Sequence, residues 1–320
     1  MKKLLLSIVL LVNISAFAGD VVKYVFLSSD ARNPANSAIY NGARDALKEM
    51  SSRYGKDLKI EFISASSSIE KQISQLSTAY LESFKGALIV PVDANAIAPK
   101  VSSLAKNGFY CASVGAEIEG GVFTCSTDYS AALKLVNAEI AKLAGGKNLT
   151  YRCYFKTAKN GDSSEPVESA LKEAFSNQFN GKEMKAIYDE LKPKVSAAMD
   201  FYSVYAKQNA DDILRTDNFA EIFFSPALLS NMLPIKDDTD RYFTICLGAL
   251  PQLEYYLATS QISLCVYDDW YGWGYYSMRV LVEKSLESIN PTSKSKLLAP
   301  LSATPKTVKS FSKDWAKWIF

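Results

Sequence analysis

Residues 22–50 read VKYVFLSSDARNPANSAIYNGARDALKEM, and this stretch decides the fold that the sequence predicts. Its first seven residues are mostly apolar, which is typical of a strand buried on both faces of a sheet. After a polar loop, apolar residues return with helical spacing at Ile39, Ala43, Ala46, Leu47 and Met50. A buried strand followed by a short loop and an amphipathic helix is the first part of a βαβ unit.

The same alternation of short apolar runs and helical stripes continues along the chain. Strands are predicted at 22–28, 58–63, 86–92, 109–114 and 122–125, and then at 149–155, 183–188, 220–225, 242–247 and 262–267. Five strands on each side of residue 128 predict an α/β protein with two doubly wound, Rossmann-like parallel-sheet lobes. In open sheets of this kind, ligands bind beyond the carboxyl ends of the strands.

Three segments of the chain are similar to a known family. The loop Ser28–Pro34 with the following Gly42-Ala43, the stretch from Ile69 to Asp93, and the stretch from Tyr267 to Gly274 resemble the periplasmic sugar-binding proteins of the ribose-binding type. The resemblance implies the type I periplasmic binding protein fold, in which the two lobes close over a small ligand.

The same resemblance implies where the chain passes between the lobes. It places a hinge of three crossing strands near 126–128, 267–269 and 299–303. The lobes are then expected to comprise 19–127 plus 268–302 and 128–267 plus 303–320, after a signal peptide at 1–18.

The chain departs from the family's pattern at most of the expected sugar contacts. Ala35-Asn36 stand where the family places two aromatic residues, and Gly115-Ala116 stand in place of an Asp-Arg pair. In the second lobe, Ser164–Val167, Pro226-Ala227 and Gly248 replace the expected Arg, Asn-Asp and Asp. The resemblance therefore predicts the fold and leaves the ligand open.

Polar residues at the predicted strand ends are the candidate ligand contacts. They are Asp30, Arg32, Asn33, Asn36, Glu117, Glu165, Asp268 and Trp270. Amide and carboxylate groups suit hydroxyl-bearing or amine-bearing ligands. The alternatives are a helix cap at Asn36 or Ser37, and solvated surface carboxylates. The later rings of the aromatic stretch, Trp273, Tyr275 and Tyr276, are expected to pack the helix.

The amino terminus has the order of a secretory signal peptide. Lys2-Lys3 precede the apolar run Leu4–Val12, and Ala16-Phe17-Ala18 form a small-x-small cleavage pattern. Without these two lysines the 36 basic residues become 34, equal to the 34 acidic residues. A neutral chain has no electrostatic footprint for nucleic acid. Export to the periplasm is expected, as a monomer.

The five cysteines leave two interpretations open. An exported chain permits disulfides, and Cys111 with Cys125 and Cys246 with Cys265 lie on neighbouring predicted strands. Buried free thiols that fill space are the alternative. Their spacing matches no metal site, and no metal or cofactor is predicted.

The absence of chemistry-bearing motifs argues against an enzyme. The chain has no histidine, which removes Ser-His-Asp and Cys-His catalysis, and it has no phosphate-binding loop. The predicted function is a solute-binding protein that delivers a small polar ligand, such as a sugar or polyol, to an ABC-type importer. The alternatives are a sensory binding protein that partners a membrane kinase or chemoreceptor, and a divergent protein that acts through protein contacts.

Overall fold

The first sheet of the protein is made almost entirely from the first 127 residues. The computed structural model describes residues 21–144, 150–154, 219–223 and 242–319. Six parallel strands form this sheet in the order β10-β5-β4-β3-β1-β2. They are β1 (Val21–Ser28), β2 (Asp57–Ser64), β3 (Gly86–Ile89), β4 (Tyr110–Val114), β5 (Phe123–Thr127) and β10 (Ser295–Leu298).

Helices cover both faces of this sheet, as expected for a doubly wound lobe. They are α1 (Pro34–Tyr54), α2 (Ile69–Leu81), α3 (Ala94–Ala105) and α11 (Trp270–Glu287). α1 and α11 share one core with one face of the sheet, and α2 and α3 share a second core with the other face. All five residues of the predicted first stripe, from Ile39 to Met50, are buried in the first core. The helical interpretation of the opening stretch is therefore confirmed.

The second sheet has the order β11-β9-β8-β7-β6. Its strands are β6 (Thr150–Tyr154), β7 (Phe219–Phe223), β8 (Tyr242–Leu247), β9 (Leu264–Tyr267) and β11 (Leu301–Ala303). Four of them are parallel, and β11 is antiparallel to β9. The doubly wound, mainly parallel arrangement is as expected, and β11 is antiparallel at the edge because it enters the sheet directly from β10 without a crossover helix. The predicted strand at 183–188 lies outside the described residues.

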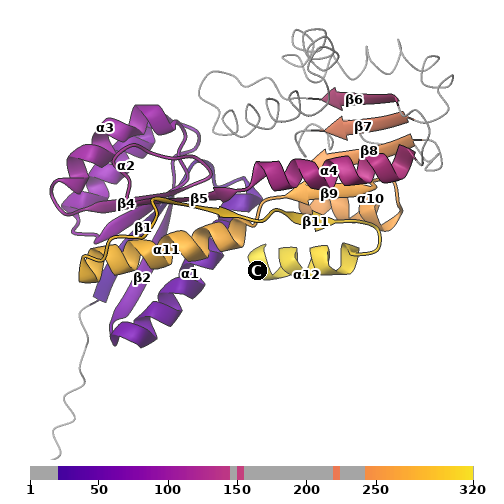
Figure 1. The fold of residues 1–320 in the computed structure, drawn as a ribbon. Coiled ribbons are helices and arrows are strands. Elements are labelled where there is room, and N and C mark those ends of the chain that lie inside the picture. Colours follow the sequence, from indigo (N-terminus) through magenta and orange to yellow (C-terminus); the bar gives the residue numbers. More distant parts are fainter. Residues whose placement is uncertain (1–20, 145–149, 155–218, 224–241, 320) are drawn as a thin grey trace, which may run out of the picture.

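Three segments connect the two sheets (Figure 1). The chain leaves the first sheet after β5 and enters α4 (Tyr129–Ala144), which lies with the second sheet. It returns from β9 to α11 of the first lobe, and it crosses again between β10 and β11. The two-lobed fold with three crossings is thus the one that the sequence predicted.

The last helix touches both lobes. α12 (Val308–Ile319) follows β11 and packs against α10 (Glu254–Ala258) of the second lobe and α1 of the first. A short 3-10 turn, η1 (Pro251–Leu253), precedes α10. In Figure 1 the carboxyl end of α12, marked C, lies in the space between the two lobes. The Nδ2 of Asn41 on α1 donates a hydrogen bond of 2.5 Å to the carbonyl oxygen of Trp318.

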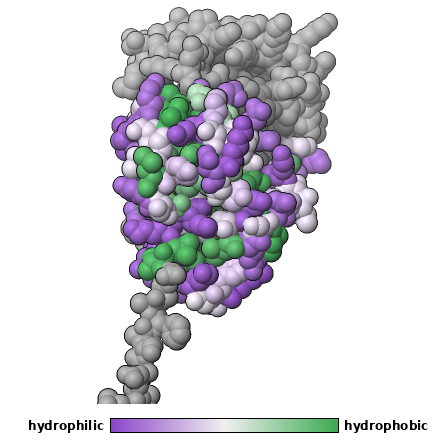
Figure 2. Space-filling view, turned by 90° about the vertical axis from the view of Figure 1, so that its left-hand side faces the viewer, coloured by the Kyte–Doolittle hydropathy of each residue, from purple (hydrophilic) through white to green (hydrophobic). Residues whose placement is uncertain are grey.

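The outer surface of the first lobe is mostly hydrophilic (Figure 2). Hydrophobic side chains gather in one band across the lower part of that face. Val21 at the start of β1 and Phe62 of the edge strand β2 are among the large hydrophobic residues that remain exposed. No helix in the described part of the chain combines the length and the apolar character that a membrane span requires.

Candidate functional site

The carboxyl ends of both sheets face the same region. β5 of the first sheet and β9 of the second both end where the chain crosses between the lobes. Because the strands neighbouring each of them run parallel, with β11 as the exception, their carboxyl ends point toward the crossings as well. The loops after these strands are therefore the place where a ligand would lie between the lobes.

The loop after β1 holds four of the eight predicted contacts, and the structure brings them together. The Nη2 and Nε of Arg32 donate to the carboxylate of Asp30, at 2.5 Å for Nη2. This pairing holds the pKa of Asp30 well below its usual range. The Arg32 side chain is 86% exposed, so its guanidinium is available to a ligand.

Asn33 and Asn36 have structural roles that the sequence did not separate. The Oδ1 of Asn33 accepts a hydrogen bond of 3.0 Å from the backbone N–H of Ala35, and Pro34 begins the helix. The cap of α1 is therefore Asn33, and the expectation of a cap at Asn36 or Ser37 was wrong. Asn36 is buried, and its Nδ2 donates to the carbonyl oxygen of Asp30 at 2.6 Å. This hydrogen bond fixes the loop to the first turn of α1.

A serine-rich loop lies directly beside the Asp30 loop. The segment Ser64–Ser68 connects β2 to α2, and the Oγ of Ser67 donates to Asp30 at 3.1 Å. Ser66 and Ser67 both have left-handed backbones, with φ of 53° and 63°. Such conformations are strained for residues other than glycine, and they concentrate at functional sites. The exposed hydroxyls of this loop therefore extend the polar surface that begins at Asp30 and Arg32.

The remaining loops of the first lobe contribute less. Asp93 after β3 caps α3, because its Oδ1 accepts hydrogen bonds from the N–H groups of Asn95 and Ala96. Glu117, a predicted contact, is exposed in the connection from β4 to β5. Gly115, with φ of 77°, opens this connection and lies against the Trp273 ring.

Asp268 is a largely buried carboxyl group at the second crossing. Burial raises its pKa to about 6. The nearby side chains of Thr127, Trp270 and Tyr129 oppose that rise. The hydroxyl oxygens of Thr127 and Tyr129 are buried and have no partner among the described residues. Asp268 therefore joins the first crossing to the second through polar groups that are only partly satisfied.

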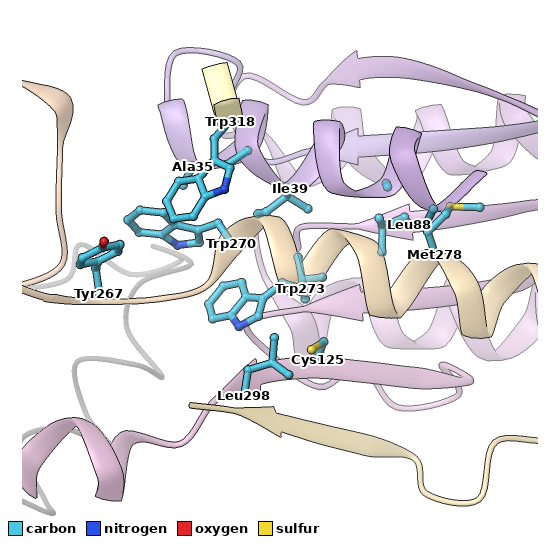
Figure 3. Packing of buried hydrophobic residues seen from close by; sticks show 14 of the residues in the cluster. Ala35, Ile39, Leu88, Cys125, Tyr267, Trp270, Trp273, Met278, Leu298 and Trp318 are labelled. Carbon is cyan, nitrogen blue, oxygen red and sulfur yellow. The ribbon is translucent and has the colours of Figure 1, made fainter. Parts of the chain in front are cut away.

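Trp270 belongs to the hydrophobic core of the junction. Its indole packs against Trp315 at 5.4 Å between ring centroids, and against Trp318 and Tyr267 at 6.2 and 6.1 Å. Figure 3 shows the Trp270 and Trp318 rings side by side, with Tyr267 next to them and Trp273 further along α11. Only 8% of Trp270 is exposed. Its role in this structure is to pack α11 against α12, and we leave it out of the ligand contacts.

The neighbouring Asp269 has a structural role. Its Oδ1 accepts a hydrogen bond of 2.8 Å from the backbone N–H of Gly272 and caps α11. Burial raises its pKa, and Lys317 opposes that rise. The two adjacent carboxylates thus have separate partners.

The second lobe is described in less detail on its ligand side. Glu165, the one predicted contact in that lobe, lies outside the described residues. β8 ends at Leu247 and continues through Gly248, whose φ is 99°. Among the residues described, no cluster of Cys, Asp and Glu side chains is arranged to hold a metal ion.

Some residues of the junction were missed by sequence reasoning. Thr127 and Tyr129 were not candidates, although Asp268 was, because only folding brings the first and second crossings together. Trp315 and Trp318 gave no signal either, since a terminal amphipathic helix does not reveal its partner. The run Ser64-Ala65-Ser66-Ser67-Ser68 was visible between a predicted strand and a helical stripe, and its polar composition could have marked the loop.

Comparison with known proteins finds solved structures of the same fold. No protein-family model and no curated protein sequence matches the chain. A galactofuranose-binding protein has a similar structure, with a TM-score of 0.70 and 13% identity over 93% of this chain and 100% of that one. A Caulobacter myo-inositol-binding protein has a TM-score of 0.65 and 16% identity, over 92% of this chain and 96% of that one.

A third similar structure is the periplasmic binding component of the arabinose ABC transporter from Shewanella sp. ANA-3. Its TM-score is 0.67 and its identity 12%, and the match covers 92% of this chain and 95% of that one. At identities this low the likeness shows the fold alone. It confirms the two-lobed architecture expected from the resemblance.

Proposed function

We propose that this chain is an exported solute-binding protein whose two lobes close over a small polar ligand of the sugar or polyol kind. The observation that carries the proposal is the convergence of both sheets' carboxyl ends on the three crossings. A ligand bound there contacts both lobes, so its binding energy favours the closed arrangement. The similar structures named above bind galactofuranose, myo-inositol and arabinose, which supports a polyhydroxylated ligand.

The lobes in this proposal are 19–127 plus 268–302 and 128–267 plus 303–320. The first 18 residues act as a signal peptide that directs the chain to the periplasm. From there the protein delivers its ligand to a membrane importer driven by ATP. The Shewanella relative is a component of such a transporter, and this supports the assignment.

The ligand contacts in the first lobe are proposed at Asp30 and Arg32, with the hydroxyls of Ser66 and Ser67 beside them. A carboxylate accepts hydrogen bonds from hydroxyl groups, and a guanidinium donates to their oxygens. The Asp30–Arg32 pair has nearly balanced charge, which suits a neutral polyol better than a free acid. Asn33 and Asn36 support the loop rather than the ligand.

A thermal-shift screen tests the function. The refolded protein, stripped of carried-over ligand, is screened against pentoses, hexoses, polyols, nucleosides, amino acids and polyamines. A ligand at one hundred times its dissociation constant adds about 2.7 kcal/mol of stability, which is easily observed. A hit among the sugars or polyols supports the proposal. Hits confined to amino acids or polyamines contradict the proposed ligand class.

Variants of the loop make the screen specific. Asp30→Asn and Arg32→Ala are expected to weaken binding of the hit at least tenfold, since each loses a charge-assisted hydrogen bond. Lys59→Ala, on the edge strand β2, removes an exposed charge far along the sheet and serves as the control. Equal binding by all three variants would place the ligand elsewhere.

A further inference from the structure

Two cysteines of the second sheet stand directly opposite each other. Cys246 of β8 and Cys265 of β9 are register partners in the parallel pairing of these strands. Both are completely buried, and both belong to the same core cluster. In the structure they are free thiols.

The backbone geometry at this pair permits a disulfide bond. Neighbouring strands lie about 4.8 Å apart, and directly opposite residues point to the same face of the sheet. A disulfide requires Cα atoms about 4.4–6.8 Å apart with side chains that approach each other. Burial raises the pKa of Cys246, and the Cys265 thiol raises it further, which agrees with two sulfur atoms in close proximity.

The other pair that the sequence left open does not meet these conditions. Cys125 is the register partner of Val114, whereas Cys111 lies three residues earlier on β4. Cys125 packs in the core on the α1 and α11 side, and Cys111 packs in the core on the α2 and α3 side. The sheet itself separates these two thiols, so they stay reduced and provide an internal control.

We propose that Cys246 and Cys265 form a disulfide bond while the chain folds in an oxidising compartment, and that this bond joins β8 to β9. The oxidant is a disulfide, either of a small molecule or of a protein. One cysteine thiolate attacks it, forms a mixed disulfide and releases one thiol. The second cysteine then attacks the mixed disulfide and releases the other thiol. The two protein thiols lose two electrons and two protons, which the oxidant's disulfide gains.

The bond forms as β8 pairs with β9, before the surrounding core covers the two sulfur atoms. In the folded protein both sulfur atoms are shielded from solvent, and the raised pKa of Cys246 leaves very little thiolate to react. The folded, reduced protein is therefore inert, while the folding chain with β8 and β9 paired is competent. A disulfide that forms only during folding has a structural role, whereas a reversible redox sensor would have to react in the folded protein.

The closed loop contains η1 and α10 and ends just before the second crossing. The bridge constrains the unfolded chain over residues 246–265, and such constraint stabilises the native state. For a protein of this size the melting temperature is expected to rise by about 5–10 °C relative to the reduced form.

The test compares oxidative and reductive refolding of the full chain. The protein is unfolded in urea with dithiothreitol and refolded either in a mixture of reduced and oxidised glutathione or in dithiothreitol alone. Thiols are alkylated after denaturation and counted by mass spectrometry, and peptides are mapped without reduction. The five cysteines of the chain should give five alkylated thiols in the reduced protein and three in the oxidised protein. A peptide linked through Cys246 and Cys265 should be found in the oxidised sample only.

Variants and timing complete the experiment. Cys111→Ser should retain the linked peptide, and Cys246→Ser should lose it. In folded, reduced protein placed in the same glutathione mixture, Cys246 and Cys265 should remain free thiols for hours. Five alkylated thiols after oxidative refolding, or a linkage that involves Cys111, Cys125 or Cys153, overturns the proposal. The wild-type map alone decides this if a variant fails to fold, and the ligand screen described above is independent of the result.

Discussion

Asp268 shows how one residue reports on the junction between the lobes. Its carboxyl group is shielded from water, and its neighbours Thr127 and Tyr129 have buried hydroxyls without full hydrogen bonding. A small rotation of the lobes would change the distances between Asp268 and the hydroxyls of Thr127 and Tyr129, because the three residues come from two different crossings. Groups that lack a hydrogen-bond partner in one arrangement of a protein can gain one in another, so such groups can bias the balance between two arrangements.

The raised pKa of Asp268 predicts a stability change with pH. Its pKa is about 6 in the folded protein, against about 3.9 in an unfolded chain. Between these values the folded state binds more protons than the unfolded state, so stability falls as pH rises from 4 to 6. Asp268→Asn should remove this fall and raise the free energy of unfolding at pH 7 by about 1–3 kcal/mol.

Urea unfolding at pH 4.5, 6 and 7.5 checks this prediction. Asp93→Asn, which alters a helix cap at the surface of the first lobe, corrects for the loss of one charge. If the stabilities of the wild type and Asp268→Asn change with pH in parallel, ionising Asp268 costs the folded protein no more free energy than the unfolded chain.

Asn36 is predicted to support the loop and not to bind the ligand. Asn36→Ala leaves the carbonyl oxygen of Asp30 without its donor and should lower the free energy of unfolding by about 1–3 kcal/mol. Asn33→Ala removes only the helix cap, and should lower it by about 1 kcal/mol. Denaturant titrations measure both. An Asn36→Ala protein with full stability but without binding of the ligand hit would instead make Asn36 a direct contact.

At the scale of elements, the pairing of α1 with α11 organises the first lobe. Tyr271 donates to Asp45 at 2.6 Å and Tyr275 donates to Glu49, so residues at four-residue spacing match along both helices. The helices approach closely because glycines face the partner backbone. A methyl group on Gly42 would meet the carbonyl of Tyr271, and one on Gly274 would meet the carbonyl of Ile39.

Alanine at these glycines is predicted to destabilise the protein. Alanine favours a helix by about 1 kcal/mol over glycine, but the collision with backbone atoms costs more. Gly274→Ala and Gly42→Ala should each lower the free energy of unfolding by about 1–3 kcal/mol net. Gly55→Ala is the matched control, because nothing lies within 4 Å of the added carbon and only its φ of 60° is unfavourable. Its cost should be about 1 kcal/mol.

Calorimetry or urea titration measures the loss of stability in each variant, and so compares the cost of steric collision with the cost of backbone strain. If Gly55→Ala proves more costly than Gly274→Ala, the close approach of α1 and α11 does not limit the packing of the lobe.

At the scale of the whole molecule, α12 holds the two lobes together from one side. It follows β11 of the second lobe, yet the carbonyl oxygen of Trp318 near its end accepts a hydrogen bond from Asn41 of the first lobe. Lys317 lies over the Tyr271 ring, 4.3 Å from its centroid. Relative motion of the lobes must therefore either carry these contacts along or break them.

This arrangement makes tryptophan fluorescence a reporter of the junction. All four tryptophans of the chain lie on α11 or α12, within one core cluster. Asn41→Ala should lower the free energy of unfolding by about 1–2 kcal/mol and increase acrylamide quenching of the native emission, because the end of α12 loses its anchor. Ser52→Ala, on an exposed part of α1, should change neither. Unchanged quenching in Asn41→Ala would show that the aromatic packing alone holds α12.

Much of the fold could be predicted because its signals are local. The apolar run before Ser28 and the stripe from Ile39 to Met50 have periods that identify a strand and a helix without tertiary context. The antiparallel β11 escaped this approach because a three-residue strand is too short to show a period.

The candidate site was predicted only in part. The loop after β1 could be selected from the sequence because all its residues are consecutive, and its contact with a ligand stays a prediction. The partners of Asp268 come from 127–129, about 140 residues earlier, and no local pattern connects these positions. Trp270 was placed near the ligand because an aromatic ring suits either a core or a binding site, and only packing against α12 distinguishes the two.

The sequence by itself determined the two-lobed α/β architecture, the position of the polar loop after the first strand and the absence of histidine chemistry. The tertiary structure decided which polar groups meet, which aromatic rings are covered, and which cysteines face each other. The reason is physical: hydrophobic periodicity depends on neighbours within a few residues, whereas burial, pKa shifts and thiol pairing depend on atoms that only the folded chain brings together.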